Sequence, residues 1–230
     1  MRSGLLDHVA RLSRSLASPL RLAAIGVVAA LVVTSVVACV GDRLSMATPT
    51  AGFWYERGSF VFPAEATTKF GGPLTGEEIE SIKQLSRTEL ERAFSGLGIT
   101  VTSNTNAFWR VEVLQSLPVR EHQPLPHAGE SLALGILGGT GAVGFDIVAL
   151  KAIQYAPISA SRQRVIEGIG RGIGRVAVHE LIHQILGVAA AHNDTDQDSY
   201  EYRSPDRSSQ YYGELHWTTA WPLLHQKFGK

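Results

Sequence analysis

The chain of 230 residues contains a single cysteine, Cys39, so no disulfide can form within it. It also lacks net charge, because 21 basic and 21 acidic side chains balance each other. Without an excess of either sign, the protein has no long-range field that would attract nucleic acid or an anionic surface. We therefore expect no nucleic acid among its partners.

Charged residues are absent from one long stretch near the N-terminus. Residues 22–40 are uncharged and apolar, and the 21 residues before them contain four arginines. This order is typical of a secretion signal with a long basic lead, or of a single membrane anchor. Residues 36–39, Val-Val-Ala-Cys, resemble the bacterial lipobox, in which the cysteine carries the lipid and becomes the mature N-terminus. We expect an exported protein of the cell envelope, attached to the membrane by a lipid on Cys39 or by residues 22–40.

The rest of the chain is predicted to be one folded domain behind a short connection. Residues 1–39 would be the signal peptide or anchor, residues 40–73 a tether followed by an entry strand, and residues 74–230 the domain.

Regular elements are indicated within the domain by the spacing of its apolar residues. Residues 75–95 repeat apolar side chains at helical spacing, and Thr75 can cap this helix. Residues 99–103 and 107–117 alternate as strands joined by an Asn-rich turn. The aromatic C-terminal part is predicted to end in a short helix that begins near residues 221–222.

The most informative motif is the pentapeptide His-Glu-Leu-Ile-His at residues 179–183. Histidines four residues apart lie about 40° apart around an α-helix, so His179 and His183 can reach one ion from the same face. Glu180 would then lie beside a metal-bound water as a general base. Zinc lowers the pKa of such a water from about 16 toward about 7, which makes it a nucleophile at neutral pH.

The surroundings of the pentapeptide favour this interpretation. Residues 161–186 carry apolar side chains at steps of three and four, as a helix with one buried face does. Gly187 is suited to end that helix, because glycine readily adopts the left-handed conformation. A turn there would bring His192 to the open side of the ion. Three histidines and a water make a catalytic zinc site with an open fourth position.

These residues resemble the metzincin metallopeptidases, whose pattern is H-E-x-x-H-x-x-G-x-x-H. His179, Glu180 and His183 coincide with the pattern, whereas Gly187 falls one residue late and His192 three residues late. The chain is thus similar to a looser bacterial branch of metzincin-like proteins. Two shorter matches are Ala-Leu-Gly at 133–135 and the Gly-to-Trp stretch at 213–217, where Leu215 stands in place of the expected Met.

The resemblance implies an α+β fold in which a mixed sheet packs on the active-site helix. It implies Zn²⁺ as cofactor, with His179, His183 and His192 as ligands, Glu180 as catalytic base, and a peptide or protein as substrate. Residues 74–230 would then be a zinc peptidase-like domain. Residues 131–137 would be the edge strand beside the cleft, to which an extended substrate could add as a further strand.

Other residues compete for the role of third ligand. Glu201 lies eighteen residues past His183, close to the spacing of gluzincin-type peptidases. However, residues 193–210 are rich in turn formers and have no apolar period, so we do not expect a second packed helix there. The remaining candidates are Asp194, Asp196 and His216. The series Asp194, Asp196 and Asp198 lacks the glycine and glutamate of a calcium loop, which indicates a solvated acidic loop instead.

Several further polar residues are assigned by their setting. His122 and His127 fall in a proline-rich loop, residues 118–129, and are expected to be solvated. One of three tyrosines could place a phenol near the zinc to stabilise an oxyanion, although packing is their default role. These tyrosines are Tyr202, Tyr211 and Tyr212.

A second motif upstream competes with the zinc interpretation. Gly139, Gly141 and Gly144 fit G-x-G-x-x-G, the dinucleotide-binding fingerprint. That fingerprint needs an acidic residue about twenty positions further on, and none occurs between Asp146 and Glu167. We therefore interpret the glycines as the turn between two strands. A non-catalytic zinc-binding or structural envelope lipoprotein stays open as the alternative function.

Overall fold

The structure is a computed structural model, which describes residues 49–118, 127–134, 138–187 and 192–229. The expected signal or anchor segment lies outside these residues, and so does Cys39. The chain divides after residue 47, and the described residues all belong to the second unit. Within that part of the chain, no helix is long and apolar enough to cross a membrane.

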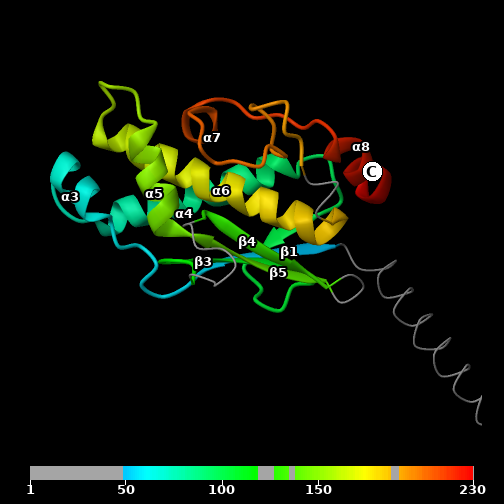
Figure 1. Cartoon of the computed structure of the whole chain (residues 1–230). Helices are drawn as coiled ribbons and strands as arrows, with labels where there is room; N and C mark the ends of the chain where they lie inside the picture. The colour runs from blue at the N-terminus through cyan, green and yellow to red at the C-terminus, as the bar shows by residue number, and fades with distance from the viewer. Residues whose placement is uncertain (1–48, 119–126, 135–137, 188–191, 230) are drawn as a thin grey trace, which may run out of the picture. The chain divides into compact units, whose positions relative to one another are not determined.

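A mixed five-stranded sheet forms one layer of this unit (Figure 1). Its spatial order is β2-β1-β3-β5-β4, in which the first four strands run parallel and β4 pairs with β5 antiparallel at the edge. The strands are β1 Thr50–Tyr55, β2 Thr100–Thr102, β3 Trp109–Leu114, β4 Gly129–Ala133 and β5 Gly139–Gly144.

Strand β1 corrects the expected domain boundary. It lies between β2 and β3, so it is an internal strand of the sheet and not an entry strand ahead of the domain. The folded unit therefore includes residues 50–73. The two strands predicted at 99–103 and 107–117 are present as β2 and β3, but they do not pair with each other. Their connection crosses β1 at Gly52, where a Cβ atom would lie 2.5 Å from the carbonyl oxygen of Asn104.

The three predicted helices are confirmed as α4 Gly76–Ala93, α6 Arg162–Leu186 and α8 Ala220–Phe228. Thr75 and Glu78 form a reciprocal capping box at the start of α4. The hydroxyl of Ser161 accepts from the amide of Arg164 at the start of α6. Gly187 ends α6 with a φ of 87°, a conformation that glycine adopts without strain. Three further helices were not predicted: α3 Ala64–Phe70, α5 Phe145–Gln154 and α7 Ser209–Tyr212.

Helix α6 is the centre of the fold (Figure 1). It packs on β3, β4 and β5, and it also contacts α4, α5, α7 and α8. The expected arrangement of a mixed sheet on a long helix, in an α+β fold, is therefore present. Most residues of α6 are buried, so its apolar side chains supply much of the core.

Four glycines let neighbouring elements approach α6 closely. Gly170 and Gly174 face α4, where a Cβ atom on Gly174 would lie 2.5 Å from the carbonyl oxygen of Ser86. Gly168 and Gly172 face the rings of Tyr212 and Tyr211. Since each pair is separated by four residues, each lies along one face of the helix. The glycine-rich sequence of α6 thus reflects packing on two sides.

The upstream glycine cluster lies in a strand and not in a turn, which corrects the prediction. Gly139 and Gly141 lie within β5, which Gly144 ends. A Cβ atom on Gly139 would lie 2.5 Å from Cγ of Gln184, so these residues are small because α6 packs against them. In a dinucleotide-binding fingerprint the glycines form the turn between strand and helix. Their position within β5 does not match that geometry.

Candidate metal centre

Three histidines meet beside the edge of the sheet. His179 and His183 lie four residues apart on α6, and His192 follows the end of this helix. Ligand atoms of the three side chains lie within 4.8 Å of one another. The Nε2 atoms of His179 and His183 are 3.1 Å apart. Among the described residues, no other three His, Cys, Asp or Glu side chains gather in this way.

His192 is brought to this place by the chain that follows it. The amide of Asn193 donates to the carbonyl oxygen of Glu201 at 2.9 Å, which joins the two ends of an acidic loop. The ring of His192 lies 5.3 Å from that of His179 and 4.8 Å from that of His183, between ring centroids. The return of His192 to the other two histidines, expected from the glycine at 187, is therefore present.

The donor set fits a zinc ion. Burial lowers the pKa of His179 and that of His183 to about 4, and burial also lowers the pKa of His192. All three imidazoles are consequently neutral at pH 7 and offer lone pairs, as metal ligands must. Ligand nitrogens of a tetrahedral zinc site lie about 3.3 Å apart when each Zn–N bond is about 2.0 Å. The 3.1 Å separation between His179 and His183 is close to that value.

Glu180 lies next to the histidines and is 6 % exposed. Its carboxylate rests over Gly129 of β4, where a Cβ atom would overlap Oε1. Burial, and secondarily the charge of Glu130, raises the pKa of Glu180 to about 8. The hydroxyl of Ser131 donates to the backbone carbonyl of Glu180 at 3.0 Å and so ties β4 to α6. Without a metal, Glu180 is therefore mainly protonated at pH 7, and a cation bound by the histidines would favour its carboxylate form.

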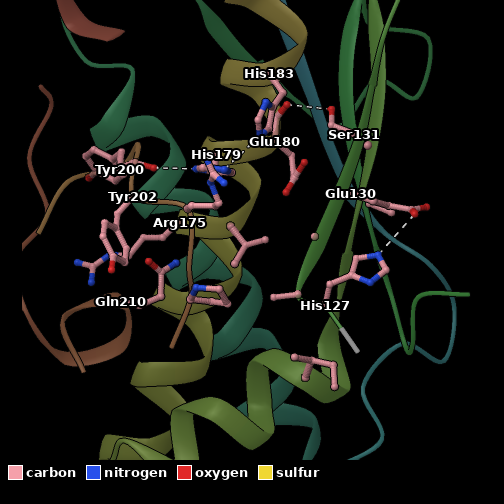
Figure 2. A pocket seen from close by; sticks show the side chains of 18 of the residues that line it. His127, Glu130, Ser131, Arg175, His179, Glu180, His183, Tyr200, Tyr202 and Gln210 are labelled. Carbon is pink, nitrogen blue, oxygen red and sulfur yellow. Dashed lines mark hydrogen bonds and ion pairs between the residues drawn. The ribbon is translucent and has the colours of Figure 1, made fainter. Parts of the chain in front are cut away.

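A cavity of about 780 Å³ adjoins these residues (Figure 2). One wall is β4 with the residues just before it, and the opposite wall is the segment from Tyr200 to Gln210. His127, which we expected to be solvated, lies in the first wall with 17 % of its side chain exposed, 3.7 Å from Glu130. This expectation is wrong for His127, and His122 lies outside the described residues.

The competing ligand candidates lie elsewhere. Glu201 is fully buried, and its Oε1 accepts from the amides of Thr218 and Ala220 at the start of α8. Asp194 pairs with Arg203 at 2.9 Å. Asp196 pairs with His216 at 2.8 Å, on the exposed side of the acidic loop. Glu201 thus stabilises the C-terminal turn, and the two aspartates stabilise their loop.

Of the three tyrosines considered for oxyanion binding, only Tyr202 lines the cavity. Tyr211 is fully buried, and the Tyr212 hydroxyl donates to the carbonyl oxygen of Ala152 at 2.6 Å. Leu215 is part of the core. The edge strand predicted at residues 131–137 is present as β4, which begins earlier, at Gly129, and ends at Ala133, with Leu134 following at the surface. Residues 135–137 of that prediction lie outside the described residues.

Some residues around the histidines were not singled out from the sequence. Gly129 and Ser131 contact Glu180 from β4, while Tyr200 accepts from His179 through its carbonyl oxygen. A glycine at the start of a strand could have indicated a close approach of the neighbouring helix. No pattern in the sequence distinguishes a backbone carbonyl as a partner of His179.

Comparison of the chain with protein-family models, with curated proteins and with solved structures found no match in any of the three.

Proposed function

We propose that this protein is a zinc metallopeptidase with a metzincin-like fold. His179, His183 and His192 would bind the ion, and Glu180 would act as the general base. The observation that carries this proposal is the meeting of three imidazoles beside a buried glutamate, next to the edge strand β4. A structural zinc site has four protein ligands, whereas three ligands beside a cavity are typical of a catalytic site.

The chain supplies the parts that peptide hydrolysis requires. Bound zinc would polarise the scissile carbonyl and lower the pKa of water. The carboxylate of Glu180 would accept the proton of that water and pass it to the leaving amine. Among the described residues, strand β4 pairs with β5 alone, and its other edge would bind an extended peptide by backbone hydrogen bonds. The hydroxyl of Tyr202, which lines the opposite wall, would donate to the developing oxyanion.

We also propose, on the sequence of the N-terminal segment, that the protein is exported and held in the cell envelope. A lipid on Cys39 or the apolar residues 22–40 would provide the attachment.

The test is a comparison of the wild-type protein with two variants. Wild-type protein should contain about one zinc per chain by elemental analysis, and His183→Ala should lose it. Glu180→Gln should keep the metal, since this residue is not a ligand. Its peptide hydrolysis should fall roughly 10²- to 10⁴-fold, because a positioned base contributes about that factor.

Two results would count against the proposal. A folded wild-type chain without zinc, after zinc-replete expression, would remove the metal site. Full zinc occupancy without cleavage of any member of a broad peptide library would favour the non-catalytic envelope protein instead.

A further inference from the structure

A buried carboxylate, that of Glu89, is connected to the histidine cluster through Tyr200. Glu89 of α4 has 7 % of its side chain exposed, and its Oε1 accepts three hydrogen bonds. The donors are Arg92 Nη2 at 2.7 Å, Arg175 Nε at 2.8 Å and the Tyr200 hydroxyl at 3.2 Å. Burial of a charge is costly unless it is paired and hydrogen-bonded. Here the guanidinium groups of Arg92 and Arg175 neutralise the charge of Glu89. The hydrogen bond between Glu89 and the Tyr200 hydroxyl can therefore form in the interior.

The close packing of two helices creates this cluster. A Cβ atom on Gly174 would lie 2.8 Å from Cβ of Glu89, so α6 approaches α4 as closely as glycine allows. The neighbouring Arg175 is 1 % exposed and reaches Glu89 from α6. Its two terminal nitrogens donate to the carbonyl oxygens of Ser209 and Gly213. Arg175 thereby joins both helices to the segment that carries Tyr200.

Tyr200 connects Glu89 to the metal centre. Its hydroxyl is held by Glu89, its ring lies 4.8 Å from that of Trp217, and its amide donates to the carbonyl oxygen of His216. Because the hydroxyl, the ring and the amide of Tyr200 are all held, its carbonyl oxygen has a defined position as well. That oxygen accepts from Nδ1 of His179 at 3.0 Å (Figure 2).

The contact selects one tautomer of His179. When Nδ1–H donates to a carbonyl, Nε2 carries the lone pair, and this atom is the one that faces His183. His183 differs, because its buried Nδ1 has no hydrogen-bond partner among the described residues. Of the two histidines on α6, His179 is therefore the one whose ring is oriented by a hydrogen bond from its Nδ1, the ring nitrogen that does not face His183.

We propose that Glu89, acting through Tyr200, is a positioning residue that orients His179 for metal binding. The inference rests on the proposed zinc site, since it concerns how one of its ligands is held. Loss of an outer hydrogen-bond partner of a ligating histidine lowers metal affinity by about 10- to 100-fold. Glu89 acts through an intermediate residue, which places the expected effect near the lower end of that range.

The variant Tyr200→Phe tests this link, because it removes only the hydroxyl that Glu89 holds. In the full-length protein in detergent, zinc affinity measured by competition with a chromogenic chelator should fall about tenfold. The visible spectrum of the Co²⁺-loaded variant should differ from that of the wild type. The matched control is Tyr55→Phe, which removes a hydroxyl that donates to the carbonyl oxygen of Lys83 at 3.0 Å, on the same helix α4. Its zinc affinity should stay within twofold of wild type.

A second measurement needs no variant. The ¹⁵N chemical shifts of the ring nitrogens in metal-free wild-type protein should show His179 protonated at Nδ1. Protonation at Nε2 would overturn the inference, and so would equal affinity losses in the two tyrosine variants. Tight zinc binding that is unchanged in Tyr200→Phe would overturn it and leave the proposed function intact. Failure of the wild-type chain to bind zinc would reject both.

Discussion

Two buried glutamates, Glu180 and Glu201, were considered for the site, and their surroundings give them different roles. Glu180 faces the cavity and lies beside the imidazoles, where the proposed reaction needs a proton acceptor. Glu201 is fully buried, and its Oε1 accepts two backbone amide hydrogens at 2.9 and 2.8 Å. The second oxygen of Glu201 has no hydrogen-bond partner among the described residues. The geometry of Glu201 is that of a structural acceptor.

Substitution of Glu201 therefore separates a structural role from a ligand role. Glu201→Ala should lower the free energy of unfolding by roughly 2 kcal/mol or more, because two amides lose their acceptor and a cavity forms. Glu201→Gln should be close to neutral, since the amide oxygen can accept both bonds. Urea denaturation measures the stability, and elemental analysis should find full zinc in both folded variants. Zinc loss in Glu201→Gln would instead identify Glu201 as a ligand.

Helix α6 carries two of the candidate metal ligands toward its end and four glycines in its first half. Its second half carries His179, Glu180 and His183, whereas its first half has four glycines that allow close contact with α4 and with two tyrosines. Glycine destabilises a helix interior by roughly 1 kcal/mol relative to alanine. The cost is offset by the contacts that the missing side chains permit, because dispersion and burial increase as the elements approach.

Replacement of one of these glycines should show that offset. Gly174→Ala should destabilise the protein by roughly 2 kcal/mol, since the strain of overpacking against Ser86 and Glu89 exceeds the gain in helix propensity. The control is Gly76→Ala in α4, where a Cβ atom would meet nothing within 4 Å. That variant should be neutral or up to about 1 kcal/mol more stable. Chemical denaturation of both proteins makes the comparison, and equal effects would show that close packing is not the reason for glycine at 174.

The whole folded unit is organised around α6, and the metal would join two of its parts. His179 and His183 belong to the central helix, while His192 belongs to the segment that closes the cavity. One ion bound to all three would therefore link the core to this segment. A ligand that binds only the folded state stabilises that state in proportion to its affinity and concentration.

Removal of zinc should consequently lower the melting temperature. At a free zinc concentration about 100 times the dissociation constant, the stabilisation is about 2.7 kcal/mol. Chelation of the wild-type protein should abolish it, and readdition of zinc should restore it. His192→Ala with intact α6 should show a much smaller response, because only two of the three ligands remain. Differential scanning calorimetry measures these shifts, and a melting temperature independent of zinc would contradict a three-histidine site.

Local chemistry alone determined several parts of this protein. The limits of α6 follow from an apolar repeat between a serine cap and Gly187, and α4 begins at Thr75, where the capping residues lie in sequence. The candidate ligands His179 and His183 are also local, because the helical repeat places residues four apart on one face. These features depend on contacts within a few residues, which a sequence displays directly.

Long-range packing decided the rest. Strand β1 was expected ahead of the domain, but only its pairing with β2 and β3 shows it to be internal. The glycines of β5 fit both a turn and a strand in the sequence, and the approach of Gln184 from α6 explains why a strand contains them. Likewise, the contact of His179 with the carbonyl oxygen of Tyr200 joins residues 21 positions apart through a backbone atom that every residue has. The sequence carries no sign of such a contact, because its partner is chosen by tertiary packing and not by side-chain type.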